Sequence, residues 1–184
     1  MNEALKKELI SLAHNDQALL RAVKDAGELL DDTYHPQLKK LHTENTKRAI
    51  EIVREGGWPA ISQVGEEGSD AMWLIVQHSV LDQEFMLSCI PQLERLVHEG
   101  EAKGWQLAFL QDRVLMLQGK PQIYGTQHEL DSNGELQPYR LACPEEVDER
   151  RKAAGLEPLV EKTRMLRADH KKVRLAREGR KRNT

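Results

Sequence analysis

Apolar residues recur every three or four positions along residues 3–30, and again from Pro36 to about Glu55. An α-helix has 3.6 residues per turn, so this spacing places the apolar side chains of each segment on one helical face. The sequence DDTYHP separates the two segments, because the residue before a proline avoids the helical conformation. The chain is therefore expected to begin with two amphipathic helices.

Three further helices are expected in the middle of the chain. Ser69 is a residue type that caps helix N-termini, and the apolar pattern after it predicts a helix that ends near Cys89. Pro91 allows either a kink or the start of a fourth helix. A short fifth helix is expected over residues 105–112.

After residue 112 the pattern changes to one that is typical of β-strands. Three strands are expected in RVLMLQ, PQIYGTQHEL and ELQPYRL, at residues 113–118, 121–130 and 135–141. Asn133-Gly134 is typical of a tight hairpin turn between the last two strands. Pro138 cannot donate a ladder hydrogen bond, so the last strand is expected at a sheet edge.

Two helices are expected at the end of the chain, one from Pro144 to Gly155 and one from Glu157 onward. The predicted fold class is mainly α: a helical bundle with a small three-stranded antiparallel β-meander. One α-rich domain is expected over residues 1–161, with the meander at about 113–141. Residues 162–184 are expected to form a basic C-terminal helix or tail.

Composition narrows the class of protein. A chain of 184 residues can bury a core without disulfides or a structural metal, and Cys89 and Cys143 match no metal-binding or redox spacing. No stretch approaches the roughly 20 apolar residues of a membrane span, and the N-terminus has no apolar signal segment. We therefore expect a cytoplasmic protein that does not enter a membrane.

Charge is unevenly distributed along the chain. Residues 162–184 contain ten Lys and Arg residues against two acidic ones, whereas the whole chain has a net charge of -3. Nucleic acid or an acidic partner could bind this tail electrostatically. A solvated terminal helix is the favoured alternative, because the tail contains no aromatic residue and no DNA-binding motif.

Polar residues interrupt the apolar faces of four expected helices, at Asp16, Asn45, His78 and Asp112. Each lies four and seven positions from apolar residues, a spacing that returns to the same helical face. Asp82 follows His78 by one turn. A buried carboxylate without a partner is costly, so such residues must bond one another or line a polar cavity. We expect the side chains of His78, Asp112 and Asp16 within about 10 Å of one another, although each alone could be a satisfied structural residue.

The expected strand PQIYGTQHEL carries polar groups on both faces, which is unusual for a strand that buries one of them. Gly125 in its middle indicates a bulge or the close approach of a ligand. A surface hairpin with polar decoration is the alternative. On the first interpretation, the candidate ligand-binding residues are Gln77, Asn45, Arg113, Gln122, Tyr124, Thr126 and Gln127.

Four segments together resemble a family of uncharacterised bacterial proteins, classed as a domain of unknown function. They are GWPAISQVG at 57–65, AMWLIVQHSVLDQEF at 71–85, AFLQDRVLMLQGKPQIYGTQ at 108–127 and VDERRKAAGLEPL at 147–159. The resemblance covers about residues 10–160, leaves out the basic tail and carries no activity. Its members are most alike around Gln77 and His78 and around the DR…G-x2-Q-x-YGTQ motif, although this chain has QHSV where the family usually reads closer to QHAD.

The first functional hypothesis is an enzyme that acts on a small polar molecule by general acid/base chemistry, as a hydrolase or lyase. His78 would be the general base, because an imidazole exchanges protons near neutral pH. One of Asp112, Asp16 and Asp82 would orient its ring, as a carboxylate does in a catalytic triad. Arg113 could hold a carboxylate or phosphate of the substrate.

Two other hypotheses stay open at this point. No cofactor is required by the first hypothesis, but His78 and Asp82 are four residues apart on the expected helix and could hold a divalent metal ion. His42 is a further candidate, because it can approach the face that carries Asn45. The chain could also be a non-catalytic binding or immunity protein whose pocket serves recognition of a small-molecule ligand.

Overall fold

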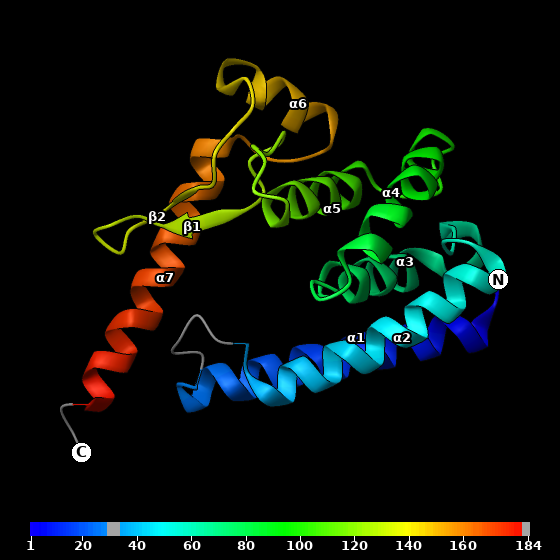
Figure 1. Ribbon diagram of the computed structural model, residues 1–184, viewed down its shortest axis with the longest axis horizontal. Helices are drawn as coiled ribbons and strands as arrows, with labels where there is room; N and C mark the ends of the chain where they lie inside the picture. The colour runs from blue at the N-terminus through cyan, green and yellow to red at the C-terminus, as the bar shows by residue number, and fades with distance from the viewer. Residues whose placement is uncertain (29–33, 182–184) are drawn as a thin grey trace. The chain divides into compact units, whose positions relative to one another are not determined.

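A computed structural model describes the backbone of residues 1–28 and 34–181 and the side chains as far as residue 174. The chain divides into two compact units, Met1–Leu110 and Gln111–Thr184. Within the described residues it is mainly helical, with helices α1 to α7 and a small antiparallel sheet (Figure 1). The mainly α fold class is therefore confirmed, while the prediction of one domain over residues 1–161 stays a prediction.

The first unit begins with two long helices, α1 (Glu3–Ala26) and α2 (Pro36–Gly56). They run side by side in opposite directions (Figure 1), and both pack against α3. The side chain of Asn2 caps the start of α1, and Gly27 ends it in the left-handed conformation. The predicted break between the helices falls partly on residues 29–33, which lie outside the described residues.

The predicted helix from Ser69 to Cys89 is wrong, because the chain forms two helices there. Helix α3 (Ile61–Gln77) starts eight residues before Ser69 and is kinked at Gly65, whose backbone is not helical. Ser69 is buried inside the part after the kink and donates from Oγ to Gln106 Oε1 at 3.4 Å. The chain leaves α3 at His78, and helix α4 (Gln83–His98) then continues through Pro91. The cause is the turn between them, in which the Ser79 carbonyl accepts the N–H of Asp82 at 2.9 Å.

The first of the three predicted strands is also wrong. Residues 113–117 belong to helix α5 (Gly104–Leu117), which starts in the first unit and ends in the second. The apolar run in RVLMLQ fits the buried side of a helix as well as a strand, since a short apolar run does not distinguish the two. The described sheet has two strands, β1 (His128–Leu130) and β2 (Leu136–Pro138), paired so that Leu130 lies opposite Leu136.

The second unit ends in three helical segments, η1 (Pro144–Glu146), α6 (Val147–Ala153) and α7 (Leu159–Lys181). Helix α7 packs against β2 and α6, and the predicted C-terminal helix extends through the basic tail as far as Lys181. No helix among the described residues is long and apolar enough to cross a membrane.

Gly125 occupies a position in the second unit that no other residue fits well. Its φ is 68°, and a Cβ added there would lie 2.8 Å from Leu159 Cδ1. We expect Gly125→Ala to lower the free energy of unfolding by about 3 kcal/mol, because it adds a steric clash to left-handed backbone strain. Gly134→Ala is the matched control, since its φ is 74° but nothing lies within 4 Å of the added Cβ.

Urea denaturation measures the difference in the free energy of unfolding between Gly125→Ala and Gly134→Ala. The control should lose only about 1 kcal/mol, the cost of the backbone conformation alone. Equal losses in both variants would show that the contact with Leu159 contributes nothing.

Candidate functional site

The first unit buries a carboxylate between two imidazole rings. Asp16, on α1, is fully buried. His78 Nδ1 lies 2.9 Å from Asp16 Oδ1 and 3.0 Å from Oδ2, and His42 Nε2 lies 2.9 Å from Oδ2. The side-chain amide of Gln17 donates a further hydrogen bond to Oδ1 at 3.2 Å. The predicted proximity of Asp16 and His78 is therefore present, and His42 joins them.

The two histidines contact each other as well as the carboxylate. The centroids of the His42 and His78 rings are 4.7 Å apart, and the ring planes are inclined at 36°. His42 comes from the second turn of α2, and its Nδ1 is hydrogen-bonded to the Tyr34 hydroxyl. If Tyr34 donates this bond, Nε2 of His42 carries the proton that points at Asp16.

Two hydroxyl groups hold the polypeptide around His78 against α2. Thr46 Oγ1 donates to Ser79 Oγ at 2.8 Å, and Ser79 Oγ donates to the Ile75 carbonyl at 3.0 Å. Thr46 is one helical turn after His42, and Ser79 directly follows His78. Since Thr46 and Ser79 are both buried, these bonds fix the position of one imidazole relative to the other.

The protonation of Asp16 is decided by two opposing effects. Burial alone would raise the pKa of its carboxyl group, because it disfavours the charged form. The hydrogen bonds and charges of His42 and His78 outweigh burial and hold the pKa well below its usual value. Asp16 is therefore an anion at neutral pH that accepts the N–H of His78 Nδ1 and lies at ion-pair distance from His42 Nε2.

A cavity of about 210 Å³ borders the two histidines. His78 keeps 20% of its side chain exposed, and within the described residues its Nε2 makes no hydrogen bond. The cavity lies between α2 and the turn that follows α3, and its walls are formed by His42, Thr43, Thr46, Lys47, Ile50, His78, Leu81 and Asp82. It therefore gives a small molecule access to the imidazole ring of His78.

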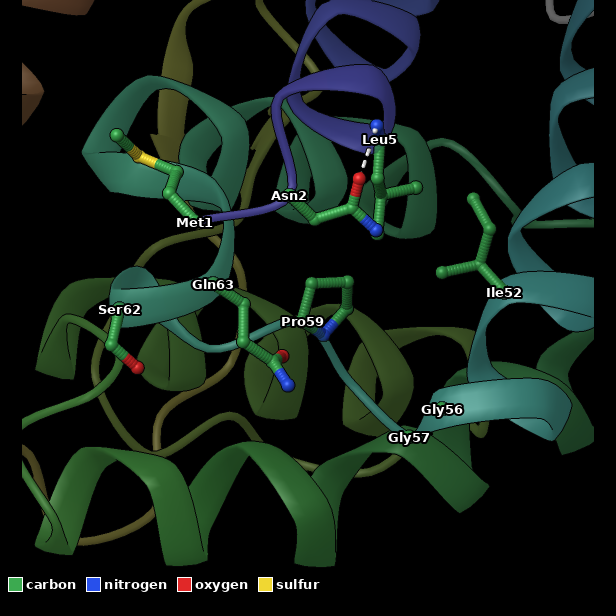
Figure 2. A pocket seen from close by; sticks show the side chains of 9 residues that line it. All are labelled: Met1, Asn2, Leu5, Ile52, Gly56, Gly57, Pro59, Ser62 and Gln63. Atoms are coloured by element: carbon green, nitrogen blue, oxygen red, sulfur yellow. Dashed lines mark hydrogen bonds between the residues drawn. The ribbon is translucent and has the colours of Figure 1, made fainter.

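A second cavity, at the start of α1, is chemically different (Figure 2). It measures about 250 Å³ and is lined by Met1, Asn2, Leu5, Ile52, Gly56, Gly57, Pro59, Ser62 and Gln63. None of these side chains titrates, and Asn2 Oδ1 is already bonded to the N–H of Leu5. The cavity beside His78 is for this reason the better candidate site.

Three other predicted site residues of the first unit make no hydrogen bond to the Asp16 carboxylate within the described residues. Asp82 borders the cavity, but it is the N-cap of α4, and its Oδ1 accepts the N–H of Phe85 at 3.0 Å. Gln77 is buried and donates to the Phe109 carbonyl at 3.4 Å. Asn45 is buried too, and its Nδ2 has no partner among the described residues. Their proposed roles in catalysis and binding stay predictions.

Asp112 belongs to the second unit, where its carboxylate is surrounded by donors from one loop. It accepts the N–H groups of Ile123, Tyr124 and Thr126 at 2.7 to 3.2 Å and the Thr126 hydroxyl at 3.0 Å. Burial outweighs these bonds and raises the pKa of Asp112. The arrangement gives Asp112 an architectural role that its position in an apolar stripe did not indicate.

The other motif residues of the second unit also bond one another. Gln122 donates to the carbonyls of Gln127 and Tyr139 at 2.9 and 2.8 Å, and its Oε1 accepts the N–H of Gln127. The amide of Gln127 in turn accepts from Arg113 Nε at 2.6 Å and donates to Thr126 Oγ1. The substrate-binding roles predicted for these residues stay predictions.

A buried arginine, Arg151, holds the same loop from its carbonyl side. Its guanidinium donates to the carbonyls of Tyr124 and Gly125 at 2.7 and 3.3 Å, and to that of Glu157 at 2.6 Å. Burial lowers the pKa of Arg151. Sequence reasoning missed this residue, because its partners are backbone carbonyls, which have no signature in the sequence.

Comparison with known protein families identifies the family to which the chain belongs. A sequence model described as "Family of unknown function (DUF6624)" matches residues 3–174. The chain belongs to this family. The match includes both histidines and Asp16, and it extends into the basic tail, which the resemblance in the sequence had left out. No curated protein and no solved structure matches the chain.

Proposed function

We propose that this DUF6624 member is an enzyme that acts on a small polar molecule by hydrolase-like general acid/base chemistry, with His78 as the base. One observation carries the proposal. The buried anion Asp16 accepts the Nδ1 proton of His78, and the same imidazole ring lines a cavity. This is the division of labour between carboxylate and imidazole in catalytic triads.

The carboxylate determines which nitrogen of His78 can act as the base. Because Asp16 stabilises the tautomer with hydrogen on Nδ1, the lone pair that can accept a proton is the one on Nε2. A water molecule in the cavity loses a proton to Nε2 while its oxygen attacks an electrophilic carbon of the substrate. Nε2 then returns that proton to the leaving group, which restores neutral His78.

The volume and the lining of the cavity limit the size and the charge of a substrate that can bind there. Its volume of about 210 Å³ is below the ~300 Å³ at which pockets for drug-sized ligands begin. One cation, Lys47, and one anion, Asp82, line it together with the hydroxyl-bearing Thr43 and Thr46. This lining favours a small neutral or zwitterionic molecule, such as an amino-acid amide or ester, or the end of a larger one.

Hydrolysis assays on a panel of amino-acid amides, small carboxylic esters and phosphate monoesters test the proposal. We expect turnover of an amide or ester, and a loss in kcat/KM of the order of 10²–10⁴ in His78→Gln, because the base is gone. His98→Gln is the matched control, since His98 is exposed at the end of α4. Full activity in His78→Gln, or no turnover across the panel, contradicts the proposal.

A further inference from the structure

The cluster around Asp16 has the composition of a metal site as well as that of an acid/base pair. One carboxylate oxygen of Asp16 and one ring nitrogen each of His42 and His78 lie within 4.8 Å of one another. The three side chains come from α1, from α2 and from the residue after α3, so they are brought together by the fold and not by a local motif.

We propose that Asp16, His42 and His78 bind a divalent first-row transition metal ion through one carboxylate oxygen, His42 Nε2 and His78 Nδ1. The inference rests on the proposed hydrolase-like function and deepens it, because it names a metal ion in place of His78 as what activates the water at the same site. The binding itself can be measured without any substrate. The set differs from the pair His78 and Asp82 expected from the sequence, since Asp82 caps α4.

The spacing of the ligand atoms fits one ion. Nitrogen and oxygen ligands lie about 2.0–2.2 Å from a zinc ion, so two of them are about 3–4 Å apart. The nitrogens of both histidines are already 2.9 Å from an oxygen of Asp16. Only small side-chain movements are therefore required for all three to reach the same ion.

The donor types select the class of metal. Two imidazoles suit zinc, iron, cobalt or nickel, whereas magnesium and calcium prefer oxygen ligands only. Two histidines and one carboxylate leave further coordination positions open, which is the arrangement of catalytic and not of structural zinc sites. The adjoining cavity gives water or substrate access to the cluster.

The hydrogen bond at the second ring nitrogen of His42 also favours a role for this residue as a metal ligand. Metal-binding histidines usually hydrogen-bond through their second nitrogen, which fixes the ring and its tautomer. His42 Nδ1 is bonded to the Tyr34 hydroxyl, and this leaves Nε2 directed at Asp16. Asp16 is fully buried, and a carboxylate so placed is costly unless a cation or hydrogen bonds compensate its charge, as a bound metal ion would.

A bound ion changes the role of one residue and keeps the rest of the proposed chemistry. His78 Nδ1 would be a ligand, and the ring proton would then be on Nε2. Such an ion would lower the pKa of its bound water and supply hydroxide as the nucleophile, so His78 would no longer act as the base. The cavity and the class of substrate stay the same.

Isothermal titration of zinc sulfate into chelator-treated, tag-free full-length protein tests the inference. We expect one equivalent of zinc to bind, and about 100-fold weaker binding in Asp16→Asn, His42→Gln and His78→Gln. His14→Gln is the control, because His14 is exposed on the same helix as Asp16. Less than a tenth of an equivalent bound, or equal affinity in His78→Gln and the control, overturns the inference.

A second readout requires no variant and so does not depend on whether the variants fold. Zinc should shift the ¹⁵N resonances of His78 Nδ1 and His42 Nε2 in the wild-type protein, and unchanged resonances also overturn the inference. The two proposals fail separately. Hydrolysis that depends on His78 without bound metal contradicts only the metal site, whereas zinc binding without hydrolysis of any substrate contradicts only the enzyme.

Discussion

Replacing Asp112 with alanine is expected to lower the free energy of unfolding of the second unit by about 4 kcal/mol. The substitution removes one acceptor that serves three backbone N–H groups and the Thr126 hydroxyl. Each buried donor left without a partner costs about 1–3 kcal/mol. The loss is partly offset where water enters the space of the missing carboxylate.

Urea denaturation and amide hydrogen exchange measure this loss. The amides of Ile123, Tyr124 and Thr126 should exchange faster in Asp112→Ala. Asp131→Ala is the matched control, because Asp131 also accepts backbone N–H groups, from Asn133 and Glu135 at 2.8 Å, but is only half-buried, whereas Asp112 is fully buried. Water can replace Asp131, so its loss should cost at most about 1 kcal/mol. Equal losses in the two variants would contradict the architectural role of Asp112.

Replacing Asp16 with asparagine is expected to reduce kcat/KM by about 10³-fold on the substrate found in the hydrolysis panel. Asparagine keeps the size of the side chain but has an amide NH₂ group in place of one oxygen. If this group donates to His78 Nδ1, the ring proton moves to Nε2, and the base toward the cavity is lost. Steady-state kinetics measure the effect, with Asp169→Asn on the exposed face of α7 as the control.

The thermal stability of Asp16→Asn must be measured together with its kcat/KM. Thermal denaturation of Asp16→Asn shows whether the loss of activity follows from unfolding, since Asp16 is buried between two helices and a turn. A folded variant with the activity of the wild type would exclude Asp16 as the residue that orients His78.

The contact between Asp16 and His78 could be predicted because helical phase is a local property. Asp16 lies four positions after Leu12, and His78 four positions after Leu74, so both were placed on inward faces without knowledge of the fold. His42 was only a further candidate, because the packing of α2 against α1 decides whether it reaches the carboxylate. Asp112 shows the limit of the same rule, since its partners are backbone N–H groups of a loop.

Two elements were predicted wrongly for physical reasons. The apolar residues of RVLMLQ fit the spacing of a helix as well as that of a strand. The segment is helical because helix α5, which begins at Gly104, continues into it. The end of α3 at His78 has no glycine or proline near it, so the pattern on both sides reads as one helix. Asp82 is a residue type that caps helices, and it was the one signal of the new helix α4.

The protonation of the His78 ring in metal-free protein tests the central claim most directly. Long-range ¹H–¹⁵N spectra distinguish the two ring nitrogens by their chemical shifts. We predict that Nδ1 carries the proton and Nε2 does not, and that this pattern disappears in Asp16→Asn. A His78 ring protonated on Nε2 alone, or a pattern unchanged by the loss of the Asp16 carboxylate, would contradict an Asp16-oriented base.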